Sequence, residues 1–346
     1  MDKRIGRNYK SRRSTRNDKK LEDLFEQFRL AKKAEGRSKR TFQTYEDSYR
    51  YFCEYLDMQG VERVFSSVTP ESVRSYMSWM LNDKRKWEGH NHKGEHEKTV
   101  GLSPVTVNTK VKGLKTMFKF LNEEGYIPTN PLANIKKVTE PIKEIQILSV
   151  QEMKKLLSVI DKSTYAGFRD YVLITVLIDS SARIGEVVSL NKLDVDFRRG
   201  MLFFNENVVK TRRARRVPIT KRTVRLLREL ISENEEFETD HIFLTNYGLP
   251  LSSNQFRQRL KKHSINAGLE LRIHPYIFRH TAATLFLENG GDVHHLAQTL
   301  GHADIRMTSR YVHLSEKSVK DQHDRYSTIN DVVGKLGKDR KIKRTT

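Results

Sequence analysis

Residues 272–313 constrain the fold more strongly than any other part of the 346-residue chain. Glycine and aspartate divide this stretch into three short segments with apolar residues at helical spacing, and Asp292 and Asp304 can cap the second and third. The stretch carries an arginine, a histidine and a tyrosine: Arg279, His302 and Tyr311. Three such side chains, brought together, can hold a phosphate and attack it. We expect the tyrosine on the last turn of a short exposed helix, where it moves easily.

Length and composition indicate a soluble protein of two domains, because 346 residues exceed what one ordinary domain needs. Apolar residues make up 37% and charged residues 31%, which is typical of a large hydrated or ligand-covered surface. The longest apolar run, Tyr171–Ile178, is too short for a membrane span, and no signal peptide is expected. The single cysteine, Cys53, cannot form an internal disulfide, so we expect a cytoplasmic protein.

A net charge of +21 makes a polyanion the expected partner. Residues 1–20 contribute +7 and residues 332–346 contribute +5, so the body between them still carries +9. For the tails alone, solubility or disorder is an equally good interpretation. A membrane surface is disfavoured because neither tail is amphipathic.

The first half of the chain is predicted to form a small all-helical domain. Four segments carry apolar residues at helical spacing: 21–34, 38–56, 70–81 and 103–121. Their aromatic residues are expected in the core. The polar loop before the fourth helix holds His90, His92 and His96. No cysteine or carboxylate pair completes a tetrahedral metal site there, so we favour a solvated loop.

The second half is predicted to be mainly helical with one small antiparallel sheet. An extended connector over 127–147 leads to Ser149 and Glu152, which have the spacing of a capping box and mark the start of the second domain. Several helices, a hairpin over 201–219 and a short strand at His241–Leu244 are expected after it.

Arg183 directly follows a buried helix, where a guanidinium is costly to bury unless a carboxylate or a phosphate receives it. Glu186 lies three residues further on, on the same helical face, and can be its internal partner. A structural ion pair and a ligand-binding arginine are equally good interpretations of these two residues alone.

The turn of the predicted hairpin is strongly basic. It carries Lys210, Arg212, Arg213, Arg215 and Arg216. So many positive charges at one turn are hard to explain by folding, and we interpret them as a finger that binds a phosphate backbone or a DNA groove. Lys210 is the candidate general acid, because an amine gives up its proton at a reachable pKa and a guanidinium does not.

These motifs resemble those of the tyrosine recombinase family, also called the phage integrase family. The matching residues are Ala182-Arg183-Ile-Gly-Glu186, Lys210 eight residues before Pro218, Arg279-His-Thr-Ala-Ala-Thr284, Leu300-Gly-His302, and Tyr311 nine residues after that histidine. Each motif alone is weak, but the full set in this order and at these spacings is specific.

The resemblance covers nearly the whole chain apart from the tails and implies a fold that is mainly α with a small antiparallel sheet. It implies a helical SAM-like core-binding domain and an α+β catalytic domain. The expected boundaries are a basic tail at 1–16, the core-binding domain at 17–138, a linker at 139–148, the catalytic domain at 149–330 and a basic tail at 331–346.

The resemblance also implies a mechanism of site-specific recombination. Tyr311 would attack a scissile DNA phosphate, forming a 3′-phosphotyrosine and releasing a 5′-hydroxyl, with neither ATP nor a metal as cofactor. Arg183 and Arg279 would stabilise the charge of the transition state. Lys210 would protonate the leaving oxygen, and His302 would bond the phosphate or assist proton transfer from the tyrosine.

One position departs from the family pattern, because Tyr276 stands where the family usually has a histidine, three residues before the second arginine. We favour Tyr276 as a substitute, since a phenol can donate a hydrogen bond to a phosphate oxygen. Alternatively His274 reaches the phosphate, or the contact is dispensable. His280, next to Arg279, is expected to be structural.

The partners implied are a specific double-stranded DNA site and three further copies of the chain, because two duplexes with two strands cut in each require four active sites. Residues 315–333 look like a tail that docks on a neighbouring subunit. A second recombinase or an accessory DNA-binding protein stays open as a further partner. The short N-terminal tail favours a transposon-type or Xer-like recombinase that acts in DNA integration or transposition of a mobile element.

Three other functions compete with this interpretation. A type IB topoisomerase uses similar chemistry without a specific partner site. A catalytically silent DNA-binding protein on the same fold and a helix-turn-helix regulator both explain the charge, but neither explains the presence of Tyr311.

Overall fold

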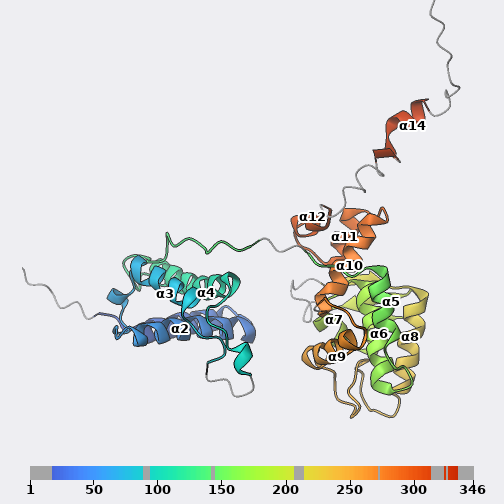
Figure 1. Ribbon diagram of the computed structural model, residues 1–346, viewed down its shortest axis with the longest axis horizontal. Helices are drawn as coiled ribbons and strands as arrows, with labels where there is room; N and C mark the ends of the chain where they lie inside the picture. The colour runs from blue at the N-terminus through green and yellow to red at the C-terminus, as the bar shows by residue number, and fades with distance from the viewer. Residues whose placement is uncertain are drawn as a thin grey trace, which may run out of the picture. The chain divides into compact units, whose positions relative to one another are not determined.

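The chain folds into two compact units that divide between Lys143 and Glu144 (Figure 1). The computed structural model describes residues 18–88, 94–141, 145–205, 214–271, 273–312, 323–324 and 326–333. Some residues of the sequence analysis lie outside this set, namely His90, His92, Lys210, Arg212 and Arg213. What the sequence predicts for them stays a prediction. Within the described ranges, every helix is too short or too polar to cross a membrane.

The described part of the first unit is all-helical, as the sequence predicts. Its elements are α1 (Leu21–Ala34), α2 (Lys39–Met58), η1 (Phe65–Ser67), α3 (Pro70–Asn82), η2 (Glu95–Glu97) and α4 (Pro104–Glu123). Hydroxyl side chains begin three of the α-helices, because Ser38, Thr69 and Ser103 each accept a hydrogen bond from a backbone N–H of the first turn.

Aromatic side chains fill the core of the first unit, which confirms the prediction made for them. Phe28, Phe52 and Tyr76 are each at most 1% exposed. The rings of Phe52 and Tyr76 meet edge to face, with their centroids 5.1 Å apart. Helices α2 and α4 approach closely at Gly113, where a Cβ atom would overlap the side chain of Ser48.

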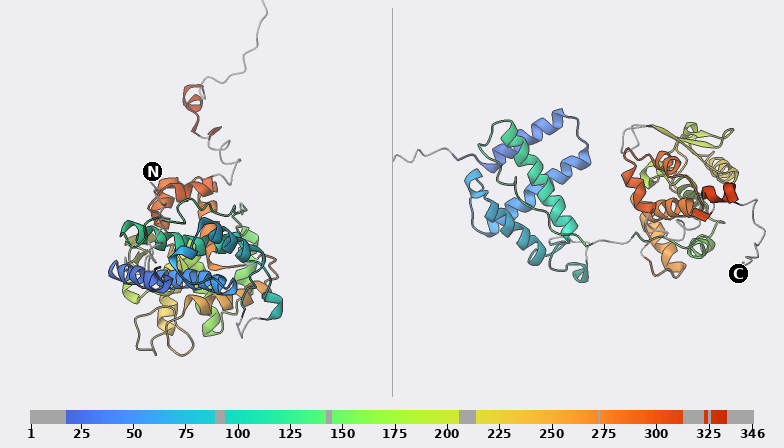
Figure 2. Two further views of the ribbon diagram at one scale, coloured as in Figure 1. Left: turned by 90° about the vertical axis from the view of Figure 1, so that its left-hand side faces the viewer. Right: turned by 90° about the horizontal axis from the view of Figure 1, so that it is seen from above.

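The described part of the second unit is mainly helical with one three-stranded antiparallel sheet, again as predicted. Its helices are α5 (Val150–Ser158), α6 (Tyr165–Ser180), α7 (Ile184–Val188), η3 (Lys192–Asp194), α8 (Lys221–Glu233), α9 (Ser253–Asn266), α10 (Pro275–Glu288), α11 (Val293–Leu300), α12 (Arg306–Val312) and α14 (Thr328–Val333). The strands β1 (Val195–Asp196), β2 (Met201–Phe204) and β3 (Arg215–Pro218) lie side by side in that order. The small sheet lies at the edge of the unit (Figure 2).

The short strand predicted at His241–Leu244 is wrong. His241 forms only an isolated bridge with Asn191, and Leu244 forms one with Pro250. Ile242, between them, is fully buried. The apolar run is therefore a loop that fills the core, because its two ends pair with different segments and neither partner continues alongside it.

Helix α5 begins at the capping box that the sequence predicts. The Ser149 side chain accepts a hydrogen bond from the Glu152 backbone N–H at 3.1 Å, and the Glu152 carboxylate accepts one from the Ser149 N–H at 2.8 Å. The two bonds satisfy backbone donors that the first turn of a helix otherwise leaves without partners.

Helix α6 is the centre of the second unit. Its residues are buried around most of its circumference, and helices α8 and α10 both pack against it (Figure 1). It ends at Ser181, which has a left-handed conformation with φ of 52°. This abrupt turn directs the chain into α7 and places Arg183 at the start of that helix.

A buried carboxylate on α6 ties this helix to α9. Asp170 is fully buried and accepts hydrogen bonds from Arg169 at 2.8 Å and from Arg259, and the Nε2 atom of His263 lies 2.9 Å from its Oδ2 atom. Burial raises the pKa of Asp170, but the bond to His263 and the charge of Arg169 outweigh it, so the pKa lies below its ordinary value.

Replacing Asp170 with asparagine should lower the free energy of unfolding of the second unit by about 3 kcal/mol, because buried Arg169 would lose its counter-charge. Both tryptophans of the chain, Trp79 and Trp87, belong to the first unit. Urea denaturation followed by circular dichroism should therefore show an earlier transition in the variant. Tryptophan fluorescence should report an unchanged transition and so serves as an internal control.

The difference in the free energy of unfolding between the parent and Asp170→Asn should depend on pH. Because folding lowers the pKa of Asp170, its charge stabilises the folded state fully above the pKa of an unfolded aspartate, about 3.9. This contribution is lost as the pH falls through the lower folded pKa, so the parent and the variant should converge in acid. A difference that persists unchanged in acid would contradict the assignment.

Candidate active site

A single buried carboxylate, that of Glu186 on α7, binds two arginines. Its side chain is 2% exposed. Its oxygens accept hydrogen bonds from the Arg183 guanidinium at 2.9 Å and from Arg215 at 2.6 Å. Burial raises the pKa of Glu186, but the bonds and charges of both arginines outweigh it and hold the pKa below its ordinary value. The ion pair with Arg183, one of the two interpretations of the sequence, is therefore present.

Arg279 on α10 is held in place by main-chain carbonyls. It is 2% exposed, and its guanidinium donates hydrogen bonds to the carbonyl oxygens of Ser181 and Leu300, each at 2.8 Å. The first carbonyl follows α6 and the second lies at the end of α11. Two turns that are far apart in the sequence thus fix the guanidinium in one orientation.

This cluster holds more positive than negative charge. The guanidinium groups of Arg183, Arg215 and Arg279 share it with the carboxylate of Glu186. Among the described residues, the hydrogen bonds of Arg279 go to neutral groups. Burial, and after it the charge of Arg183, lower the pKa of Arg279 to about 10, as expected for a buried cation beside another cation. An anion such as a phosphate would relieve this repulsion.

His302 lies beside Arg279, immediately after the left-handed Gly301 that ends α11. Its Nε2 atom is 3.0 Å from a guanidinium nitrogen of Arg279, and its Nδ1 atom is 2.7 Å from the hydroxyl of Thr308 on α12. Burial and the charge of Arg279 lower the pKa of His302 to about 4, so the ring is neutral near pH 7. Since the guanidinium can only donate, Nε2 accepts and Nδ1 carries the proton.

Tyr311 on α12 is buried, which corrects the expectation that it lies on an exposed turn. Its side chain packs into a small cluster with Ala283, Leu296 and Leu300, and the residue is 3% exposed. Its hydroxyl lies 2.8 Å from Nδ1 of His280. Burial raises the pKa of Tyr311, an effect that the positive charges of Arg279 and Arg310 only partly oppose.

Tyr276 occupies the first turn of α10 and is 44% exposed. Its ring centroid lies 6.0 Å from that of His280. The structure therefore places Tyr276 next to the partner of Tyr311, on the solvent side of the cluster.

Arg215 needs a correction, because the sequence analysis assigns it to DNA contact. Its side chain is 8% exposed and is bound to Glu186. Its Nε atom donates to the carbonyl oxygen of Thr299 at 3.1 Å, and its guanidinium lies 4.8 Å from the ring centroid of Phe204. Arg215 therefore connects β3 to α7 and to the turn that carries His302. The physical reason is its strand position, which faces the same side as buried Val217.

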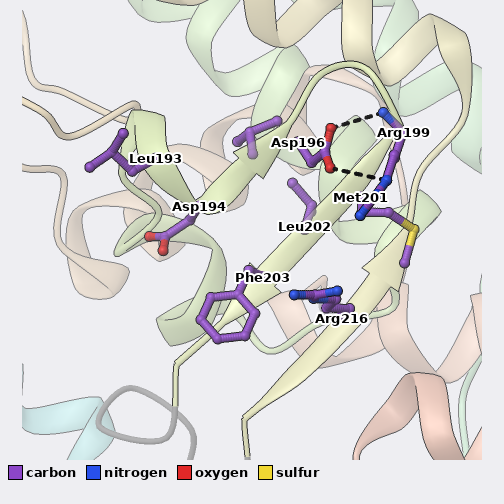
Figure 3. A pocket seen from close by; sticks show the side chains of 9 residues that line it. Leu193, Asp194, Asp196, Arg199, Met201, Leu202, Phe203 and Arg216 are labelled. Atoms are coloured by element: carbon purple, nitrogen blue, oxygen red, sulfur yellow. Dashed lines mark hydrogen bonds and ion pairs between the residues drawn. The ribbon is translucent and has the colours of Figure 1, made fainter.

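Arg216, the next residue, points to the opposite side of β3 and is exposed. It borders a hollow of about 500 Å³ with Phe203, which lies opposite it on β2, and with Asp194 (Figure 3). Of the basic residues of the hairpin that the structure describes, Arg216 is thus the one free to face a ligand. The hollow is lined by residues of the sheet, η3 and the turn between β1 and β2. Arg183, Arg279 and Tyr311 do not line it.

The sequence analysis missed two contacts within this cluster, the ion pair of Arg215 with Glu186 and the contact of His280 with the Tyr311 hydroxyl. Arg215 could have been found from its spacing of two residues from Val217 in a strand. The contact of His280 carries no comparable signal, because its partner lies 31 residues away and the direction of α12 is not encoded locally. Among the described residues, no group of three or more histidine, cysteine, aspartate or glutamate side chains is arranged to hold a metal ion.

Each of the two units matches a family model of phage integrases. The phage integrase SAM-like domain matches residues 20–138, and the phage integrase family matches residues 146–318. The chain is 26% identical to tyrosine recombinase XerD of Listeria innocua over 312 residues, which is 88% of this chain and 98% of that protein. It is 31% identical to tyrosine recombinase XerC of Chlamydia muridarum over 264 residues, which is 75% of this chain and 78% of that protein.

Solved structures are similar in fold. A Tn1549 transposon integrase in complex with a circular intermediate DNA matches with a TM-score of 0.66 at 18% identity, over 88% of this chain and 99% of that one. The site-specific recombinase XerH, bound to a palindromic difH substrate, matches with a TM-score of 0.65 at 21% identity, over 86% of this chain and 82% of that one.

Replacing Arg215 with alanine should destabilise the second unit by about 2–3 kcal/mol, because a buried charge-assisted hydrogen bond and the link to Thr299 are lost together. Replacing Arg216 with alanine should change stability by less than about 0.5 kcal/mol, since it is an exposed strand residue. Urea denaturation followed by circular dichroism measures both. Equal effects of the two substitutions would contradict the distinction.

Proposed function

The chain belongs to the phage integrase family of tyrosine recombinases, and on this premise we propose that the arginine, histidine and tyrosine cluster of its second unit is the centre of catalysis. As a member of this family, the chain is a tyrosine-type site-specific recombinase that cleaves and rejoins DNA. The observation that supports the location of the centre is the excess positive charge around Arg183 and Arg279, close enough to Tyr311 to act on its pKa.

In this proposal the two arginines hold the scissile phosphate. Arg279 is oriented by the carbonyl groups of Ser181 and Leu300, and Arg183 by the carboxylate of Glu186. Because these partners fix each guanidinium before DNA arrives, little reorganisation is needed when charge develops on the phosphate oxygens. Glu186 therefore acts as a positioning residue that does not touch the phosphate.

Tyr311 is the proposed nucleophile. Its phenolic oxygen attacks phosphorus, the bond from phosphorus to the 5′-oxygen breaks, and a 3′-phosphotyrosine remains on the enzyme. Lys210, which lies outside the described residues, is proposed to protonate the leaving 5′-oxygen. The free 5′-hydroxyl of a partner strand then attacks the phosphotyrosine in reverse, so that neither ATP nor a metal ion enters the bond balance.

His302 and Tyr276 complete the proposed phosphate site. In the free protein, Nε2 of His302 accepts a hydrogen bond from Arg279, so it can contact a phosphate only after this bond is exchanged or the ring gains a proton. Tyr276 is exposed beside the cluster and can donate its phenol proton to a phosphate oxygen.

We further propose how the chain engages DNA. Residues 17–138 form the core-binding domain and residues 149–330 the catalytic domain, joined by a linker at 139–148 and flanked by basic tails. The exposed Arg216 of β3 contacts the phosphate backbone, together with Arg212 and Arg213, which lie outside the described residues in the turn that the sequence predicts. Double-stranded DNA with a specific site is the substrate, and four copies of the chain act together in the synaptic complex.

For the biological setting, we propose an Xer-like or transposon-type recombinase. Relatives named XerD and XerC match over most of this chain, and the fold also matches that of an integrase named for the transposon Tn1549. Integration or transposition of a mobile element is therefore the proposed role.

Replacing Tyr311 with phenylalanine should abolish covalent attachment to DNA and leave DNA binding intact, because the variant loses only the attacking hydroxyl. We would incubate both proteins with nicked suicide duplexes taken from the DNA that flanks the gene and resolve them on denaturing gels. Binding would be measured by gel shift on the same duplexes. A covalent band that persists in the phenylalanine variant would refute the assignment of Tyr311.

Replacing Lys210 with alanine should slow cleavage of a normal duplex by a factor on the order of 10² to 10⁴, the usual contribution of a general acid. A duplex with a 5′-thiolate leaving group needs no acid, so the variant should cleave it at nearly the parent rate. Arg216→Ala is the matched control, because it removes a positive charge near the same turn and should show no selective rescue. Failure of the thiolate to rescue Lys210→Ala would exclude Lys210 as the acid.

A further inference from the structure

The hydroxyl of Tyr311 lies within hydrogen-bond distance of a histidine that the sequence analysis considered structural. Nδ1 of His280 is 2.8 Å from this hydroxyl, and the two ring centroids are 5.7 Å apart. The other histidine of the cluster, His302, is occupied on both sides, by Arg279 at Nε2 and by Thr308 at Nδ1. In the described part of the chain, His280 is thus the base that already contacts the nucleophile.

The direction of this hydrogen bond follows from its surroundings. Burial and the charges of Arg310, His274 and Arg279 lower the pKa of His280 to about 4, and burial raises the pKa of Tyr311. Near neutral pH the imidazole is therefore uncharged and the phenol keeps its proton. The phenol donates to the lone pair of Nδ1, and Nε2 carries the ring proton.

We propose that His280 is a catalytic residue that accepts the phenolic proton of Tyr311 as the tyrosine attacks DNA. The inference rests on the function proposed above. As the bond from oxygen to phosphorus forms, the phenolic proton moves to Nδ1 of His280, and the leaving 5′-oxygen receives a separate proton from Lys210. Rejoining reverses both transfers, and His280 returns its proton to the departing phenolate. No oxidant, reductant or metal is required.

The charges around His280 make this transfer depend on DNA. In the free protein, burial and then the positive side chains of Arg310 and Arg279 disfavour an imidazolium at this position. A bound phosphate brings negative charge to the same cluster and offsets part of that repulsion. His280 therefore becomes a competent acceptor when the scissile phosphate is in place, and the free enzyme keeps its nucleophile protonated.

The decisive substitution is His280→Asn. The amide oxygen of asparagine can occupy the place of Nδ1 and accept the hydrogen bond from Tyr311, but it cannot take up the proton. We expect His280→Asn to fold and to bind the suicide duplexes like the parent, and to form the covalent adduct at a rate lower by a factor on the order of 10². His294→Asn, an exposed histidine of α11, is the matched control and should leave the rate unchanged.

Two further measurements separate proton transfer from a purely structural role. Adding imidazole should partly restore adduct formation by His280→Ala, which opens space beside Tyr311, and should not affect Tyr311→Phe. A duplex with a 5′-thiolate leaving group should not rescue His280→Asn, because the defect lies on the attacking side, whereas it should rescue Lys210→Ala.

A parent rate in His280→Asn would overturn the proposal, since the hydrogen bond alone would then suffice. A faster rate in His280→Ala would overturn it too, because His280 would then hold Tyr311 in an inactive position. A different outcome would remove the proposed function. If the unaltered protein forms no adduct that depends on Tyr311, both the proposed function and this inference are wrong. An adduct in the parent, with no defect in the histidine variants, removes this inference alone.

Discussion

The rest of the site depends on the ion pairs that the carboxylate of Glu186 forms with two arginines. It binds Arg183 on its own helix and Arg215 on β3, and Arg215 in turn binds the carbonyl group of Thr299 next to the turn of His302. One negative charge thus connects three segments that are remote in sequence. Without it, three guanidinium groups would share a buried space with no counter-charge in the described cluster, and their repulsion would push the segments apart.

The same charge balance supports the proposed binding of an anion at this site. Glu186 compensates only part of the positive charge of the cluster, which leaves an excess that the proposed phosphate would offset. The excess charge also acts on the histidines, because the positive neighbours add to the effect of burial, and together they lower the pKa of both His280 and His302. The free protein therefore holds His280 and His302 neutral and Tyr311 protonated, a resting state that the proposed phosphate binding would change.

How far the sequence predicts this structure depends on how local each signal is. The helical first unit, the capping box at Ser149 and the pairing of Arg183 with Glu186 follow from spacings of three or four residues, which hydrophobic periodicity and helix geometry dictate. An apolar run resembles a strand whether or not a neighbouring strand extends beside it, so the pattern around Ile242 predicts a strand where the structure has a loop. Whether an apolar run becomes a strand depends on which segment lies beside it, and this is set by the tertiary structure.

The basic hairpin shows a second limit, because composition does not tell which side of a strand a residue faces. Arg215 and Arg216 are chemically identical neighbours, yet one is bound to a buried carboxylate and the other borders an open hollow. Counting charges assigns both to DNA, whereas the alternation of a strand separates them once Val217 is recognised as a core residue. The burial of Tyr311 had no such signal, because it depends on how α12 packs against α10 and α11.

Helix α10 sets the geometry that joins the proposed phosphate site to Tyr311, the proposed nucleophile. Arg279 and His280 are consecutive, so they point about 100° apart around the helix axis, the first toward His302 and the second toward Tyr311. His302 is bound to Thr308, three residues before Tyr311 on α12, so that the helix of the nucleophile is also tied to the phosphate side. The two links form a closed path through α10, the turn after α11 and α12. A shift of α12 that moves Tyr311 would therefore alter the hydrogen bond that Nδ1 of His302 donates to Thr308, which couples the position of the proposed nucleophile to the proposed phosphate contacts.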